Sequence, residues 1–204
     1  MAVGQRVERR RAATRERLVS TALALFAKHG IYEATVEDIT EAADVGKGTF
    51  YQHFRSKTAI IRHLLHEGFD ELLHQCRQEV QPSATAQERV EGLLRAQFQF
   101  FGKRRDLLLL FHQVRGLIKL QPNHARFLQK EYERYIHFLA SELAASLDGK
   151  RCSKETVQQM ACAMAGLVTG YLSYVAVLGL KTDQGVELEI STRMFFKGVV
   201  ERMQ

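Results

Sequence analysis

Apolar side chains recur along this chain at the spacing of α-helices. Leu18, Ala22 and Phe26 lie four residues apart, and Gly30 follows where such a helix would end. Further along, Thr85 and Glu88 form a capping pair in front of another apolar row. The same start and stop signals predict the remaining helices at 36–43, 47–54, 56–76, 106–120, 123–147, 157–178 and 183–203. We therefore predict an all-α protein of about nine helices, with no strand and no internal repeat.

The composition agrees with a helical globular protein. The chain has 204 residues, 46% of them hydrophobic, which is enough to form a core without disulfides or structural metals. The chain has only two prolines and no tryptophan, so it offers few of the turn signals that a sheet of many strands needs. The three cysteines are odd in number and lack the spacing of metal ligands, which favours a reducing cytosol. We expect a cytoplasmic protein that needs no cofactor and no metal.

Positive charge is concentrated near the N-terminus. The chain has a formal net charge of +6. Its first basic cluster, here called the arginine arm, consists of six residues: Arg6, Arg9, Arg10, Arg11, Arg15 and Arg17. No apolar segment of the kind found in a secretory signal follows this arm. The charge balance suggests a polyanionic partner.

Two short helices joined by a tight turn follow the arm. Proteins use this arrangement to place a helix in the major groove of DNA. The apolar side chains Ile39, Phe50 and Phe54 are expected on the inner face. Polar side chains then occupy the outer and flanking positions of the second helix: Lys47, Thr49, Tyr51, Gln52 and His53. Of these, Lys47 and Gln52 are our candidates for contacts with base edges.

The residues of this region resemble the signature of the tetracycline-repressor (TetR/AcrR) family of bacterial transcriptional regulators. The resemblance lies in TVEDI at 35–39 and in ADVGKGTFYQHFRSK at 43–57, within a similar stretch from about residue 12 to 64. It implies that Thr49, Tyr51, His53 and Lys57 contact the DNA backbone. It also implies a regulator, expected to be a repressor, that binds a palindromic operator as a homodimer and is released by a small-molecule effector.

Some residues depart from the family pattern. Asp44 stands where the family usually has glycine, and aspartate tolerates the left-handed turn required there. Gly46 replaces the usual serine or alanine and removes a hydroxyl. The first of the two short helices carries Glu37, Asp38 and Glu41, which would repel phosphate if they faced it. The arginine arm can compensate by adding affinity that falls steeply with salt.

We divide the chain into an arm and DNA-binding domain at 1–56 and a ligand-binding and dimerisation domain at 57–204. One recognition helix contacts only a few base pairs, so two copies related by a dyad are expected. The segment from 157 to 178 has no charged residue and contains a GxxxG pattern, and we expect it to pair with its copy beside the last helix. The expected interface residues are Ala163, Gly166, Gly170, Met194 and Val199.

The middle helices are rich in aromatic residues, which suggests a pocket for a small, largely apolar effector. The predicted pocket residues are Phe98, Phe101, Phe111, His112, Arg115, Tyr132, Tyr135, Tyr171 and Tyr174. Gln113 is a further polar candidate. The alternative for each of these aromatic residues is an ordinary position in the core, and for any single residue we favour that alternative.

Other classes of protein remain open at this point. The uncharged GxxxG segment also fits a membrane helix that dimerises, although its glutamines, tyrosines and hydroxyl residues dilute its apolar character. An enzyme that uses the aromatic pocket is a further alternative, but the sequence contains no GxSxG, P-loop, GxGxxG or HExxH motif. His66, Asp70 and His74 share one helix face, which we interpret as a solvated face rather than a metal site.

Overall fold

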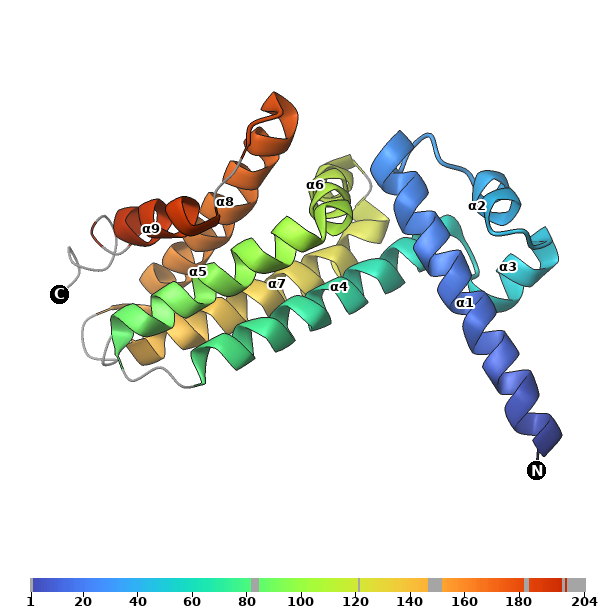
Figure 1. The fold of residues 1–204 in the computed structure, drawn as a ribbon, viewed down its shortest axis with the longest axis horizontal. Coiled ribbons are helices and arrows are strands. Elements are labelled where there is room, and N and C mark those ends of the chain that lie inside the picture. Colours follow the sequence, from blue (N-terminus) through green and yellow to red (C-terminus); the bar gives the residue numbers. More distant parts are fainter. Residues whose placement is uncertain are drawn as a thin grey trace. The chain divides into compact units, whose positions relative to one another are not determined.

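The computed structural model describes residues 2–81, 85–120, 122–146, 152–181, 184–195 and 197. Within these ranges it contains nine α-helices and no strand, which confirms the predicted all-α class (Figure 1). The helices are α1 (Ala2–His29), α2 (Val36–Ala42), α3 (Lys47–His53), α4 (Lys57–Val80), α5 (Ala86–Lys103), α6 (Arg105–Leu120), α7 (Pro122–Ser146), α8 (Lys154–Leu178) and α9 (Gln184–Phe195).

These helices form two compact units. The first contains the described residues of 1–67 together with 109–128, and the second contains those of 68–108 and 129–204. Packing thus returns residues 109–128 to the N-terminal helices, which a division of the chain in sequence order cannot express. The functional division after residue 56 stays a prediction.

The arginine arm is the beginning of α1. Residues 2–17 contain no proline and are rich in alanine, arginine and glutamate, all of which favour helix. The side chains of Arg6, Arg9 and Arg10 are exposed on this part of the helix. The chain therefore presents these charges along a helix, where we had expected an arm preceding one. The helix ends as predicted, because Gly30 adopts a φ of 85° that favours glycine.

Local signals in the sequence fix the corner between α2 and α3. Thr35 Oγ1 accepts a hydrogen bond from the Asp38 N–H at 3.1 Å, and Asp38 Oδ2 accepts one from the Thr35 N–H at 2.8 Å. This reciprocal capping box starts α2. Asp44 then has a φ of 50°, so it does adopt the left-handed turn for which the family usually has glycine.

In the second unit, α5 is packed against α8 and α9. The helix starts with the predicted capping box, in which Thr85 Oγ1 accepts from the Glu88 N–H at 3.1 Å. Leu93 and Phe100 are completely or almost completely buried on its inner face. Gly92 allows α5 to approach α4, because a Cβ atom at this position would lie 2.9 Å from the carbonyl oxygen of Glu79.

By length and composition, α8 could cross a membrane. Its most apolar window has a mean hydropathy of 1.7, and 33% of that window is buried within the protein. A packed core helix meets the same criterion. Val157, Met164 and Val168 are buried, and α8 is packed against α5 and α9. The helix therefore has a packing role in the fold, whatever its outer face contacts.

Candidate DNA-binding site

One face of α3 is exposed and polar, and the opposite face is buried. Phe50 has no exposed surface, and its ring lies 6.0 Å from that of Phe54, which is also buried. Lys47, Tyr51 and Gln52 are exposed on the other side, with 54% of Tyr51 accessible. Since the buried phenylalanines orient the helix, they also determine which side chains face outward.

The two remaining candidates on α3 flank this exposed face. Thr49 and His53 are half-buried, one helical turn apart. Burial lowers the pKa of His53, and the positive charges of Arg11 and Arg15 lower it further. At neutral pH His53 is therefore a neutral hydrogen-bonding group. Its contact with DNA stays a prediction.

A residue of α2 holds the first side chain of α3. The Lys47 ammonium donates a hydrogen bond to the Glu37 carboxylate, and both side chains are largely exposed. The lysine holds the pKa of Glu37 below its usual range. This pair offsets the charge of one of the three carboxylates that would repel phosphate if they faced it. Nothing in the sequence pattern indicated it, because ten residues separate the partners.

Lys57 lies at the start of α4, where the resemblance implies contact with the DNA backbone. In the structure its ammonium donates to the carbonyl oxygens of Tyr32 at 3.1 Å and Ala34 at 2.8 Å. These bonds fix the loop in front of α2. An ammonium has three donors, so one of them is left for a phosphate. Lys57 can therefore position α2 as well as contact DNA.

Arg15 joins α1 to the start of α4. Its guanidinium lies 4.6 Å from the centre of the Phe54 ring and donates to Nδ1 of His63 at 3.3 Å. Burial lowers the pKa of His63 and the charge of Arg15 lowers it further, while Glu67 opposes the shift. A neutral His63 can accept this bond, whereas a protonated one would repel Arg15.

Gln113 of α6 binds the end of α1 through both atoms of its amide. The Ile31 N–H donates to its Oε1 at 2.7 Å, and its Nε2 donates to the carbonyl oxygen of Phe26 at 3.1 Å. Sequence reasoning offered Gln113 as a polar group for an effector. The structure instead uses its amide inside the first unit, to fasten the turn at Gly30 that leads to α2.

A helix-turn-helix with a buried aromatic core and an exposed polar second helix defines a class of DNA-binding proteins. Residues 18–64 match the family model described as "Bacterial regulatory proteins, tetR family". The chain is thus similar to that family over the residues that contain its helix-turn-helix. The resemblance inferred from the α2–α3 residues is confirmed.

Curated relatives include transcriptional repressors. The repressor KstR2 of Mycobacterium tuberculosis is 31% identical over 108 residues, which are 53% of this chain and 54% of the relative. The repressor DhaR of a Mycobacterium species is 42% identical over 62 residues, covering 30% of this chain and 31% of the relative. The chain thus spans about half the length of the curated relative KstR2.

A solved structure extends the likeness to most of the fold. The regulator FadR from Bacillus subtilis, solved in complex with stearoyl-CoA, has a TM-score of 0.77 at 17% sequence identity. The similarity covers 90% of this chain and 98% of that one. At this level of identity the fold alone is shared, with its N-terminal helix-turn-helix and C-terminal helical domain.

The predicted pocket residues are distributed over both units. Phe111, His112 and Arg115 lie in the first unit, where Arg115 is exposed and donates to His112. The other predicted residues belong to the second unit: Phe98, Phe101, Tyr132, Tyr135, Tyr171 and Tyr174. The structure does not show these nine side chains around one cavity, so the pocket stays a prediction.

Two contact groups contain four of the six predicted pocket residues of the second unit. Phe69 lies 5.2 Å from Tyr132 and 5.5 Å from Tyr135, measured between ring centres. Tyr135 is buried and donates its hydroxyl to Gln97, and burial raises its pKa well above its ordinary value. Phe98 lies 6.0 Å from Tyr171. These contacts are typical of a packed core. A core position was the alternative to a pocket position for each of these residues.

Two cavities of the second unit are lined by other residues. One, of about 830 Å³, lies between α7 and the beginning of α8, with Lys130, Arg134, His137 and Val157 among its lining side chains. The other, of about 450 Å³, lies between α5 and α9. None of the predicted pocket residues lines either cavity.

The described residues contain no group of three His, Cys, Asp or Glu side chains placed to hold a metal ion. Asp70, from the histidine-containing face of α4, forms an ion pair with Arg134. Burial raises the pKa of the Cys76 thiol to about 12, so this cysteine is not a thiolate at neutral pH.

Proposed function

We propose that this protein is a transcriptional repressor that binds a palindromic operator as a homodimer and is released by a small, largely apolar effector. The observation that carries the proposal is the exposed polar face of α3, held in place by the buried rings of Phe50 and Phe54. Lys47 and Gln52 contact base edges in this proposal, and Thr49, Tyr51, His53 and Lys57 contact the backbone.

The outer surface of α8 and α9 supports the homodimer. Between residues 157 and 178 of α8 this surface is uncharged, and Ala163 and Gly166 are exposed on it, with Gly170 half-buried. Val177 is 80% exposed and Met194 of α9 is 60% exposed. Exposed apolar side chains do not stabilise a monomer. An isologous interface would bury the same side chains on both copies of the chain. Val199, the fifth predicted interface residue, lies outside the described residues.

The aromatic side chains of the middle helices support an effector of apolar character. Tyr171 is 39% exposed and donates its hydroxyl to Glu187 at 3.3 Å, so it presents both an apolar face and a fixed polar end. An effector can release DNA only if its affinity differs between the bound and the free conformation of the protein. Such a ligand would therefore weaken DNA binding, and DNA would weaken its binding in return.

Selection from a random duplex library tests the proposal. Wild-type protein should enrich one inverted repeat, and Q52A should enrich a repeat that is degenerate at one position of each half-site, because the amide that discriminates bases is gone. On the selected duplex, K47A should weaken binding by about 1–3 kcal/mol. The matched variant K103A, which removes an exposed lysine of the second unit, should bind like wild type.

Enrichment of no sequence by the wild-type protein would contradict the proposal. So would an identical consensus for wild type and Q52A together with unchanged affinity of K47A, because α3 would then not contact the bases.

A further inference from the structure

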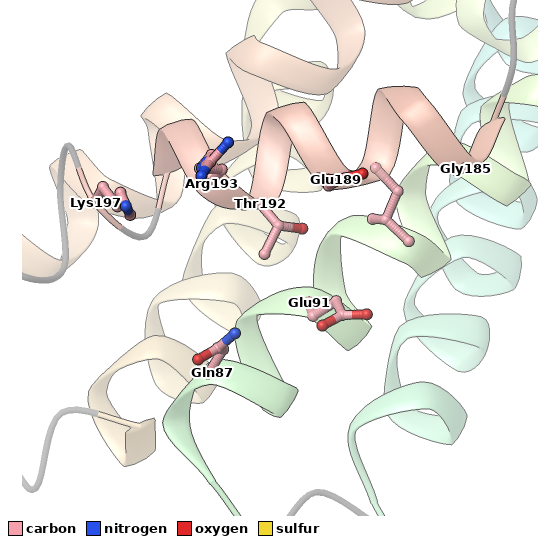
Figure 2. Close-up of a pocket in the computed structure, with 8 residues that line it drawn as sticks. Gln87, Glu91, Gly185, Glu189, Thr192, Arg193 and Lys197 are labelled. Carbon is pink, nitrogen blue, oxygen red and sulfur yellow. The ribbon is translucent and has the colours of Figure 1, made fainter.

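The cavity between α5 and α9 is polar and is separate from the predicted DNA-binding and effector residues. It has a volume of about 450 Å³. Gln87 and Glu91 reach into it from α5, while Glu189, Thr192 and Arg193 line it from α9 (Figure 2). Lys197, just beyond α9, completes this wall. All of these residues belong to the second unit.

Among the described residues, the buried hydroxyl of Thr192 has no hydrogen-bond partner. The residue is only 9% exposed, and its Oγ1 makes no hydrogen bond within the described protein. Threonine in a helix usually donates to the carbonyl four residues earlier. Thr169 of α8 does this, with Oγ1 2.8 Å from the carbonyl oxygen of Ala165. The Thr192 side chain instead points from α9 toward α5, into the cavity (Figure 2).

A buried hydroxyl without a partner destabilises a protein, so a ligand that forms a hydrogen bond with it in the cavity would remove this cost. The surrounding charges indicate what that partner carries. Arg193 and Lys197 lie four residues apart in the sequence, and within the described residues neither has an ion-pair partner. The amide of Gln87 adds a further donor to this cationic end.

Negative charge lies on the other side of Thr192. Glu189 precedes Arg193 by one turn and has no ion-pair partner among the described residues. Glu91 is already engaged, since Arg95 donates to its carboxylate at 2.6 Å. The cavity therefore offers two cations, one carboxylate that no cation of the described residues neutralises, and a hydroxyl that lies between them along α9. A dianion would be repelled by Glu189, and a wholly apolar molecule would leave these groups unsatisfied.

We propose that this cavity binds a small zwitterion of the amino-acid class. Arg193 and Lys197 hold its carboxylate, Glu189 holds its ammonium group, and the Thr192 hydroxyl bonds to the ligand between them. Residues one turn apart on a helix are separated by about 6 Å, a span that suits opposite charges a few bonds apart. Recognition by two charged ends gives selectivity over molecules that carry only one of them.

Calorimetry on the full chain tests this site with the twenty L-amino acids, first as a mixture at about 10 mM each and then singly. Acetate, methylammonium and inorganic phosphate serve as probes with one type of charge. We expect at least one amino acid to bind with a stoichiometry of one per chain. T192V should weaken that binding about fivefold or more, and R193Q about tenfold or more.

The free protein supplies an independent measurement. T192V should be at least as stable as wild type, because it removes a buried hydroxyl without a partner while keeping the shape of the side chain. E189Q should weaken amino-acid binding without weakening acetate binding. K181Q, which removes an exposed lysine outside the cavity, is the matched control for R193Q and should bind like wild type.

Three results would overturn the proposal. The first is the absence of saturable binding by every amino acid. The second is equal affinity of wild type, T192V and R193Q, which would place binding elsewhere. The third is tighter binding of phosphate than of any amino acid, which would assign the cavity to anions. None of these measurements involves DNA, so they fail or succeed independently of the proposed operator binding.

Discussion

Gln113 should be essential for the stability of the first unit, and the variant Q113M tests this. Methionine has nearly the same length as glutamine and is a good helix former, but it can neither accept from the Ile31 N–H nor donate to the carbonyl of Phe26. The substitution therefore removes both hydrogen bonds between α6 and the end of α1. It leaves the volume of the side chain almost unchanged.

The two lost bonds differ in cost. The carbonyl oxygen of Phe26 also accepts from the Gly30 N–H at 3.0 Å, so it keeps one partner. Loss of the second bond there costs about 1 kcal/mol. The Ile31 N–H has no other partner within the described residues, and the residue is 2% exposed. An unsatisfied buried donor costs about 1–3 kcal/mol, so Q113M should lower the free energy of unfolding by about 2–4 kcal/mol.

Urea unfolding gives the total effect, and hydrogen exchange locates it. The Ile31 amide should exchange about tenfold faster or more in Q113M. Q78M is the matched control, because Gln78 is exposed on α4, and it should unfold like wild type. Equal unfolding free energies for Q113M and wild type, with equal protection of the Ile31 amide, would refute the reasoning about this contact.

Three further predictions concern packing, a loop and pH. G92A should lower the free energy of unfolding by about 1–3 kcal/mol, because its Cβ would lie 2.9 Å from a backbone oxygen of α4. Thermal unfolding of both glycine variants measures this effect. G116A is the control, because a Cβ atom there would meet nothing within 4 Å, and it should be neutral or stabilising. Equal effects of G92A and G116A on stability would exclude a clash at Gly92. K57M loses the two hydrogen bonds from Lys57 to the loop carbonyls, so urea unfolding should show a free energy of unfolding about 1–2 kcal/mol lower than that of wild type. R55M, which changes an exposed arginine, is the control. Equal stability of the two variants would show that the bonds of Lys57 contribute nothing. The pKa of His63 is lowered, so below its ordinary value the unfolded chain binds a proton that the folded protein resists, and stability falls as pH falls from about 7 to 5. H63Q should lose less stability over this range, and an unchanged pH profile would assign the loss to other groups.

Features that depend on neighbouring residues were predictable from the sequence. The capping boxes at Thr35 and Thr85 need a partner only three residues away, and both are present. The same holds for the left-handed turns, since Gly30 and Asp44 adopt positive φ where the chain reverses direction. The periodic spacing of apolar side chains predicted the helices. For this reason the order of the helices and the exposed face of α3 followed from the sequence.

Contacts between distant residues were not predictable. Gln113 reaches the Phe26 carbonyl across 87 residues, and no local pattern distinguishes it from a polar group in a pocket. The arginine arm is the beginning of α1 because helix propensity and the following core residues agree, although its charges suggested only a basic arm. An orphan hydroxyl such as that of Thr192 appears only when its surroundings are known. Aromatic composition, likewise, does not separate a packed core from a ligand pocket.

Footprinting of the selected duplex, together with the number of chains bound to it, is the most direct test of operator binding by α3. The account predicts two chains per duplex and two protected half-sites related by a dyad, with centres about one helical turn or a multiple of it apart. Protection should weaken equally at both half-sites in the K47A variant at moderate salt. A single protected patch, or uniform protection that simply fades as salt rises, would contradict the account.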